Sequence, residues 1–314
     1  YTLCVLTIYF WCCPRGRFPL HVNMHNKALS VPGSGMPLGF TTIAQKLKAA
    51  GYATHAVGKW QCVSTCCGAL VLPVDSAVAL YLIVSGTVVS SLGFATPAQT
   101  PLERGFDTYF GYFGGFNDYL HAWSEQTCPR YPALNNTITY DNAAADRTKC
   151  TSSSVHARHL RSTTDLWLNS HPAHGINGSG FEEAQFEERV LGIIAGHSPS
   201  TPLFLYYPMH LVHSPLCVPE GYLEKFSFIK HADDNVNHDR QYVAAMVNYL
   251  DDVVGNVVQA LKDAGLWQST LFVWSSDNGA AVELTTGMKN SYPLRGGYTT
   301  NWYDSASLLS LPLL

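Results

Sequence analysis

Apolar positions along this chain alternate between helix-like and strand-like spacing. Residues 41–50 place Ile43 and Leu47 at helical spacing, with a threonine available as N-cap and Gly51 available to end the helix. Residues 52–60 follow as a short predicted strand that runs into a Gly-Lys turn. A helix followed by a strand is the repeating unit of α/β proteins, so this stretch predicts that class.

The second half of the chain repeats the alternation with longer elements. Residues 182–195 predict an amphipathic helix with acids in its first turn, and residues 201–207 predict a buried strand. Residues 241–264 carry the longest apolar stripe at helical spacing, and residues 271–274 predict a second buried strand. We therefore expect an α/β fold with a mostly parallel mixed sheet sandwiched between helices.

Two stretches depart from this alternation. Residues 93–123 are rich in Gly and aromatic side chains, which is typical of a loop region that shapes a pocket. Residues 61–92 are apolar and without clear periodicity, and Asp75 is their only charged residue. Pro73 and Asp75 argue against a membrane span there, while the apolar character argues against an exposed loop. We expect residues 61–92 to be irregular and poorly packed.

Composition narrows the classes of function. The 314 residues carry a formal charge of −4 and are 46% hydrophobic, so the chain can bury a sizeable core. The slight acidity and the lack of a clustered basic stripe argue against a nucleic-acid partner. Residues 1–13 form an apolar run that is too short to span a bilayer, which leaves a signal-peptide tail, a core strand or foreign sequence open. No stable membrane span is expected.

Polar side chains gather where the predicted strands end. The residues concerned are Lys59, His213, Asp277 and Asn278. Since parallel strands share one carboxyl edge, we expect these four side chains to meet around a single anion pocket with a cation beneath it. Carboxylate and amide oxygens suit a divalent cation, whereas Lys and His suit an anion. For Asp277-Asn278-Gly279 alone, an ordinary strand-ending turn is the alternative.

Six motifs occur in a fixed order along the chain. They are GRFPLHVN (16–23), AAGYATHAVGKW (49–60), TPLERGFDTYFGYF (100–113), STPLFLYYPMHLVHSPLCVPEGYLEKF (200–226), YVAAMVNYLDDVVGNVVQAL (242–261) and LFVWSSDNG (271–279). Together they resemble the sulfatase family, in its arylsulfatase B-like branch, within the alkaline phosphatase superfamily. The resemblance implies a partial catalytic domain of the sulfatase N-terminal type at 14–302, interrupted by an apolar insertion at 61–92. Residues 1–13 and 303–314 do not match the family.

The resemblance implies a sulfuric ester hydrolase that acts on aryl or carbohydrate sulfate esters. It makes Asp277 and Asn278 ligands of one Ca²⁺ ion, and it gives Lys59 and His213 sulfate-binding and catalytic roles. The family's nucleophile is a formylglycine, which a formylglycine-generating enzyme makes from the cysteine of a Cys-x-Pro-Ser/Thr-Arg motif. Cys12 is the candidate that lies nearest to this motif.

The sequence also departs from the family's pattern. Neither Ser nor Thr follows Pro14 in the Cys12 motif, Gly16 stands at the place of its arginine, and Tyr298 replaces an expected sulfate-binding lysine. The paired aspartates that supply the other half of the Ca²⁺ ligands, the N-terminal strand and the C-terminal subdomain have no counterpart. Two functions stay open: an arylsulfatase-type hydrolase of which this chain has negligible turnover, and a non-catalytic sulfatase-like protein that binds sulfated glycans.

The family is found in the secretory pathway, in lysosomes or outside the cell. Glycosylation acceptors at Asn135 and Asn177 agree with such a location. The resemblance leaves the particular sulfate ester open. Specificity is expected to reside in the aromatic stretch 109–123 and in the C-terminal part that has no counterpart here.

Overall fold

The structure of the chain is a computed structural model that describes residues 37–60, 78–84, 96–114, 119, 138–140, 165–173, 175–176, 180–213, 216–229 and 235–276. Its elements are, in chain order, α2 (Ile43–Ala49), β1 (Ala53–Lys59), β2 (Val78–Val84), η2 (Pro97–Gln99), β3 (Thr108–Tyr112), β4 (Ile138–Tyr140), β5 (Trp167–Leu168), β6 (His171–Pro172), α4 (Glu182–Gly196), β7 (Leu203–Pro208), β8 (Cys217–Pro219), α5 (Glu220–Glu224), α6 (Asn235–Asp263), η3 (Trp267–Ser269) and β9 (Thr270–Ser276).

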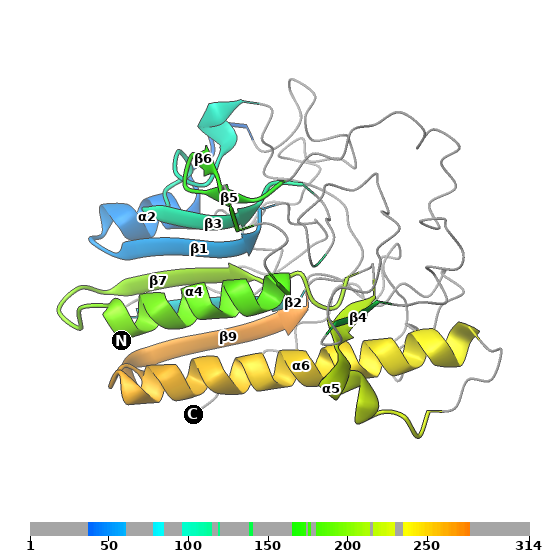
Figure 1. Ribbon diagram of the computed structural model, residues 1–314. Coiled ribbons are helices and arrows are strands. Elements are labelled where there is room, and N and C mark those ends of the chain that lie inside the picture. Colours follow the sequence, from blue (N-terminus) through cyan, green and yellow to red (C-terminus); the bar gives the residue numbers. More distant parts are fainter. Residues whose placement is uncertain are drawn as a thin grey trace, which may run out of the picture.

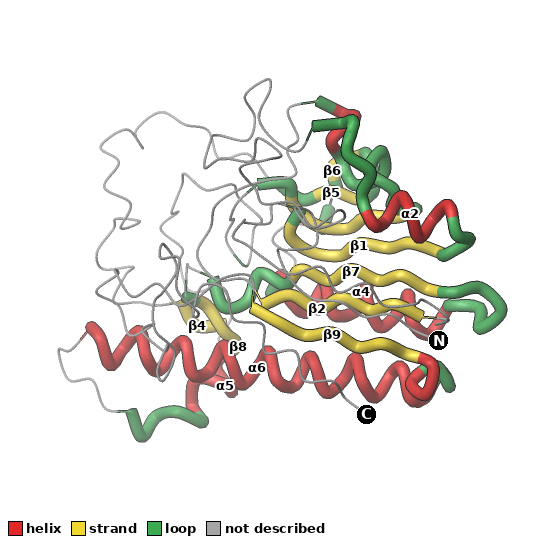
Figure 2. Tube along the Cα trace, turned by 180° about the vertical axis from the view of Figure 1, so that it is seen from behind, coloured by secondary structure: helices red, strands yellow, loops and turns green. Residues whose placement is uncertain are grey.

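One seven-stranded sheet organises the molecule, in the order β6-β5-β3-β1-β7-β2-β9. Strands β3, β1, β7, β2 and β9 are parallel, and β5 and β6 add an antiparallel edge. The long helices α4 and α6 lie side by side over one face of β7, β2 and β9 (Figure 1), and the view from behind places these strands in front of the helices (Figure 2). A separate two-stranded ribbon pairs β4 with β8. The predicted mixed, mostly parallel sheet with helices is confirmed.

The elements that hydrophobic periodicity predicts are present with shifted ends. Thr42 caps α2 through a capping box with Gln45, in which its hydroxyl accepts from the Gln45 N–H at 3.0 Å. Helix α6 begins at Asn235 rather than at residue 241, and β9 extends the predicted strand to 270–276. Within the described ranges, no helix combines the length and the hydropathy that crossing a membrane requires.

The core extends over both faces of the sheet. Every residue of β7 is buried, as expected of a strand covered on both faces. Phe106 stacks on Phe204 and on Tyr206, with ring centroids 5.7 and 5.9 Å apart. Burial of each such ring contributes roughly 1.5–3 kcal/mol. The predicted stripe of α6 faces this core except at Val247, which is 47% exposed.

Strand β2 contradicts the expectation that residues 61–92 are irregular, because residues 78–84 form a strand between β7 and β9. Tyr81 is in register with Tyr206 on one side and with Val273 on the other. A strand with parallel neighbours on both sides is apolar throughout, so the missing alternation that suggested irregularity is the pattern of a central strand. That residues 61–92 are an insertion relative to the family stays a prediction.

The bounds of strand β3 were not predicted, since the composition of residues 93–123 suggested a loop region that shapes a pocket, and Thr108–Tyr112 within it pairs with β1. The glycines of this stretch suggested a loop, but Gly111 has a packing role. A Cβ at Gly111 would overlap the carbonyl group of Gly58 on β1. The glycine therefore permits close strand pairing, and the aromatic residues around it favour a strand.

Proline at position 81 should disrupt the sheet, because a strand paired on both sides uses its backbone N–H groups in the ladder. We expect Tyr81→Pro to lower the free energy of unfolding by about 2 kcal/mol or more, through a lost hydrogen bond and backbone strain. Tyr81→Val keeps the N–H and is the matched control. Urea denaturation followed by circular dichroism measures both, and equal stability of the two variants would contradict the placement of β2.

Candidate functional site

Lys59 is held at the carboxyl end of β1 by the residues on either side of it. Gly58 has a φ of +110°, and a Cβ there would overlap the carbonyl oxygen of Pro208 at the end of β7. Trp60 is buried, and its indole N–H donates to the carbonyl oxygen of Gln99 at 3.2 Å. Lys59 itself is only 2% exposed. The Gly-Lys-Trp sequence thus fixes a buried ammonium group next to the end of the neighbouring strand.

His213 lies in a turn that follows β7. Its backbone N–H donates to the carbonyl oxygen of His210 at 2.9 Å. The hydroxyl of Tyr119 donates to the carbonyl oxygens of His210 and His213, at 3.1 and 2.9 Å, in a three-centre hydrogen bond. The Tyr119 ring also stacks on the His210 ring, with centroids 4.0 Å apart. Both histidines are buried, and the buried side chain of Tyr119 fixes the turn.

His210 is the common neighbour of Lys59 and His213. The rings of His210 and His213 have centroids 5.7 Å apart. The pKa of His210 lies well below its usual range, first because of burial and then because of the positive charges of His213 and Lys59. His213 therefore lies against one buried, neutral imidazole, and Lys59 acts on the pKa of the same group.

The other predicted site residues, Asp277, Asn278 and Cys12, lie outside the described residues. Strand β9 ends at Ser276, one residue before Asp277, and it runs parallel to β1 and β7. Within the described ranges, no group of three His, Cys, Asp or Glu side chains could hold a metal ion. These residues do not form a Ca²⁺ site by themselves, so we assign no chemical step to the ion. The meeting of all four side chains around one pocket stays a prediction.

Two acidic residues at the start of α4 contact the histidine turn, and the sequence did not reveal this. The Glu183 carboxylate accepts from the backbone N–H of His210 and, at 3.0 Å, from that of Leu211. The Glu182 carboxylate lies 3.1 Å from Nδ1 of His210. The sequence suggested only that these acids complement the helix dipole. A helix that precedes a parallel strand starts at the carboxyl edge, and this signal could have placed the acids beside the turn.

The protonation of this cluster follows from its burial. Burial raises the pKa of Glu183 to about 7, although the N–H groups of Leu211 and His210 and the hydroxyl of Tyr207 act in the opposite direction. The neighbouring carboxylate of Glu187 raises it further. Because His210 is neutral and its Nδ1 faces the Glu182 carboxylate, we assign its proton to Nδ1.

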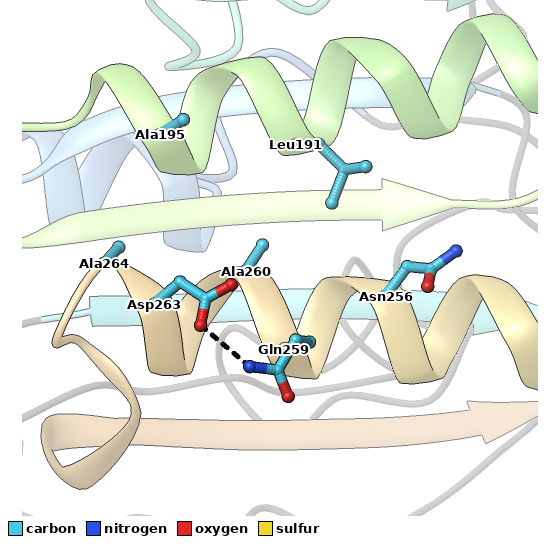
Figure 3. Close-up of a pocket in the computed structure, with 7 residues that line it drawn as sticks. All are labelled: Leu191, Ala195, Asn256, Gln259, Ala260, Asp263 and Ala264. Atoms are coloured by element: carbon cyan, nitrogen blue, oxygen red, sulfur yellow. Dashed lines mark hydrogen bonds between the residues drawn. The ribbon is translucent and has the colours of Figure 1, made fainter.

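A hollow lies between α4 and α6 (Figure 3). It is lined by Leu191, Ala195, Asn256, Gln259, Ala260, Asp263 and Ala264. The Gln259 amide donates to the Asp263 carboxylate at 2.8 Å. These aliphatic, amide and carboxylate side chains provide no cation for an anionic ligand, so the hollow is not a sulfate site.

The fold defines an α/β protein with a mostly parallel sheet, and the candidate residues Lys59 and His213 follow two of its adjacent parallel strands. The family model described as Sulfatase matches residues 12–308, so the chain belongs to the sulfatase family. The family that the motifs predict is confirmed.

Curated relatives include Arylsulfatase J of Mus musculus, which is 30% identical over 91% of this chain and 36% of the relative. N-acetylgalactosamine-6-sulfatase of Mus musculus is 22% identical over 85% of this chain and 40% of the relative. Among solved structures, Ps i-CgsB has a TM-score of 0.63 at 22% identity, over 95% of this chain and 52% of that chain. At that identity the likeness shows the fold alone. The chain spans about a third to a half of the length of these proteins.

Glu183 makes stability depend on pH in a direction opposite to that of most carboxylates. Its pKa is about 7 in the folded chain, against 4.5 for an unperturbed glutamate, so the folded state holds more protons between these values and this contribution to stability falls as the pH rises. Glu183→Gln removes the titration. We expect the free energy of unfolding of the variant, minus that of the parent, to rise by about 2–3 kcal/mol from pH 5 to pH 8.

Urea denaturation of both proteins at the two pH values gives this difference. The neutral His210, with Glu182, His213 and Lys59 around it, titrates in both proteins. Because folding lowers the pKa of His210, the contribution of this residue to stability is lost as the pH falls below the pKa of an unfolded histidine. The same loss occurs in both proteins, so it largely cancels when their stabilities are subtracted. If the free energy of unfolding of the variant minus that of the parent is the same at pH 5 and pH 8, the raised pKa of Glu183 is contradicted.

Proposed function

We propose that the chain carries the sulfate-ester site of an arylsulfatase-type sulfuric ester hydrolase that acts on aryl or carbohydrate sulfate esters. The observation that supports this is the placement of Lys59 and His213, both buried, beside His210 at the ends of adjacent parallel strands. An ammonium group and an imidazole N–H can bind sulfate oxygens and oppose the charge that develops on the leaving oxygen. The names of the relatives, arylsulfatase and N-acetylgalactosamine-6-sulfatase, support the substrate class.

The proposal includes the cofactors that the family resemblance implies. Asp277 and Asn278 would supply oxygen ligands to Ca²⁺, since they directly follow β9 in the sequence. A formylglycine would be the nucleophile, with Cys12 as its candidate precursor. A carbohydrate ester fits a further likeness, to a structure described as Ps i-CgsB in complex with k-i-k-neocarrahexaose, with a TM-score of 0.58 at 22% identity. We also propose a location in the secretory pathway, in lysosomes or outside the cell.

A second candidate function is sulfated-glycan binding without catalysis. The observation that favours it is the sequence around Cys12, where Arg15 follows Pro14 in place of Ser or Thr. A chain that binds sulfate through Lys59 and His213, but cannot form the nucleophile, would keep affinity and lose turnover. The two candidates therefore share one binding site and differ in chemistry.

The assay uses the purified chain with 4-nitrophenyl sulfate and Ca²⁺. We expect negligible turnover, together with binding that is measurable by titration calorimetry. His213→Ala and Lys59→Ala should each weaken binding by roughly 10- to 100-fold, which corresponds to the loss of one charge-assisted hydrogen bond. His55→Ala is the control, because this histidine also lies on β1 but contacts Thr108 at 2.7 Å.

Affinity that is unchanged in both site variants would contradict the proposed site. Turnover that disappears in His213→Ala would keep the site, overturn the expectation of an inactive chain, and exclude the non-catalytic function.

A further inference from the structure

The carboxylates of the two acids that open α4 contact the turn after β7, and that of Glu183 also contacts β7 itself. Glu183 Oε1 accepts from the backbone N–H groups of His210 and Leu211, and its Oε2 accepts from the Tyr207 hydroxyl at 3.4 Å. Glu182 Oε2 faces Nδ1 of His210 at 3.1 Å. The turn is therefore held through its backbone by one carboxylate and through a ring by the next.

Such a pair is costly to bury. Glu183 is fully buried and Glu182 is 3% exposed. A buried carboxylate loses its hydration, and an apolar side chain would stabilise the same helix packing without that penalty. What an apolar side chain cannot do is accept two adjacent backbone N–H groups of the turn. The chemistry that only the carboxylate provides is the fixing of that backbone.

We propose that Glu183 is a positioning residue for His213, with Glu182 as a second anchor that acts through the ring of His210. This inference rests on the proposed function of His213 as a sulfate-binding group. Glu183 fixes the first two residues of the turn, and the hydrogen bond from the His213 N–H to the His210 carbonyl oxygen carries that position to His213. Tyr119 fixes the two carbonyl groups from the other side.

Removal of the Glu183 carboxylate would leave two buried N–H groups without their acceptor, so the turn would rearrange to satisfy them. A shift of the order of 1 Å in a positioned side chain is enough to reduce binding or rate substantially. Because Glu183 lies beneath the turn and is fully buried, its effect on the ligand would act through His213 rather than by direct contact.

The test compares three full-length variants with the parent chain. Glu183→Ala removes the carboxylate, Glu183→Gln keeps an oxygen that can accept from both N–H groups, and Val190→Ala destabilises α4 at a buried position outside the turn. Two quantities are measured: the affinity for 4-nitrophenyl sulfate, and the imidazole ¹H–¹³C resonance of His213, which is assigned by its loss in His213→Ala. In Glu183→Ala, the affinity is expected to fall by about tenfold or more and the His213 resonance is expected to shift. Values near those of the parent are expected in Glu183→Gln and Val190→Ala.

Parent-like affinity and resonance in Glu183→Ala would overturn the inference, and so would equal losses in Val190→Ala, which would mark a general effect of stability. If the parent chain itself does not bind the sulfate ester, the proposed function fails and the resonance alone decides the inference. A His213 resonance that shifts in Glu183→Ala and not in Val190→Ala would then support positioning, and an unshifted resonance would overturn it.

Discussion

The close approach of β1 to the end of β7 is the constraint on which the candidate site depends. Only a residue without a Cβ fits at position 58, because the carbonyl oxygen of Pro208 occupies the space where that atom would lie. The positive φ of Gly58 adds a second reason for glycine. Lys59 follows directly, and the turn that carries His213 begins at His210, two residues after Pro208. The contact between the strand ends thus brings together the two backbone segments that carry Lys59 and His213, which are distant in the sequence.

A second constraint on the turn after β7 comes from helix α4, which packs against the sheet. The helix starts at the carboxyl edge because it precedes a parallel strand, so its first acids meet the turn after β7. Burial of Glu182 and Glu183 is tolerated since the His210 and Leu211 groups offer them N–H donors. The result is a turn whose geometry is set by hydrogen bonds on both sides.

Much of the fold could be predicted from the sequence, for identifiable reasons. Helices α4 and α6 and strand β7 have one apolar face or are apolar throughout, and such patterns survive in tertiary structure. Strand β2 could not be recognised, because a strand between two parallel neighbours lacks alternation and resembles any apolar run. Strand β3 was hidden by its glycine, whose role is visible only from the neighbouring strand.

Some residues of the candidate site could likewise be predicted from the sequence, and others could not. Lys59 and His213 could be proposed from their place after predicted strands, and in the structure both follow adjacent parallel strands and lower the pKa of His210. Glu183 could not be proposed as part of that site, since the first turn of a helix is an ordinary place for acids and only topology reveals the partner of this one. Side chains that act through a backbone leave no spacing pattern in a sequence, so they are found by following hydrogen bonds.

The central claim is that Lys59, His213, Asp277 and Asn278 meet around one pocket. A crystal structure of the chain with Ca²⁺ and a non-hydrolysable aryl sulfate analogue tests it most directly. The account predicts the sulfate group between Lys59 Nζ and the His213 ring, with Asp277 and Asn278 on the cation beneath it. A sulfate group bound elsewhere, with Lys59 and His213 facing separate surroundings, would contradict it.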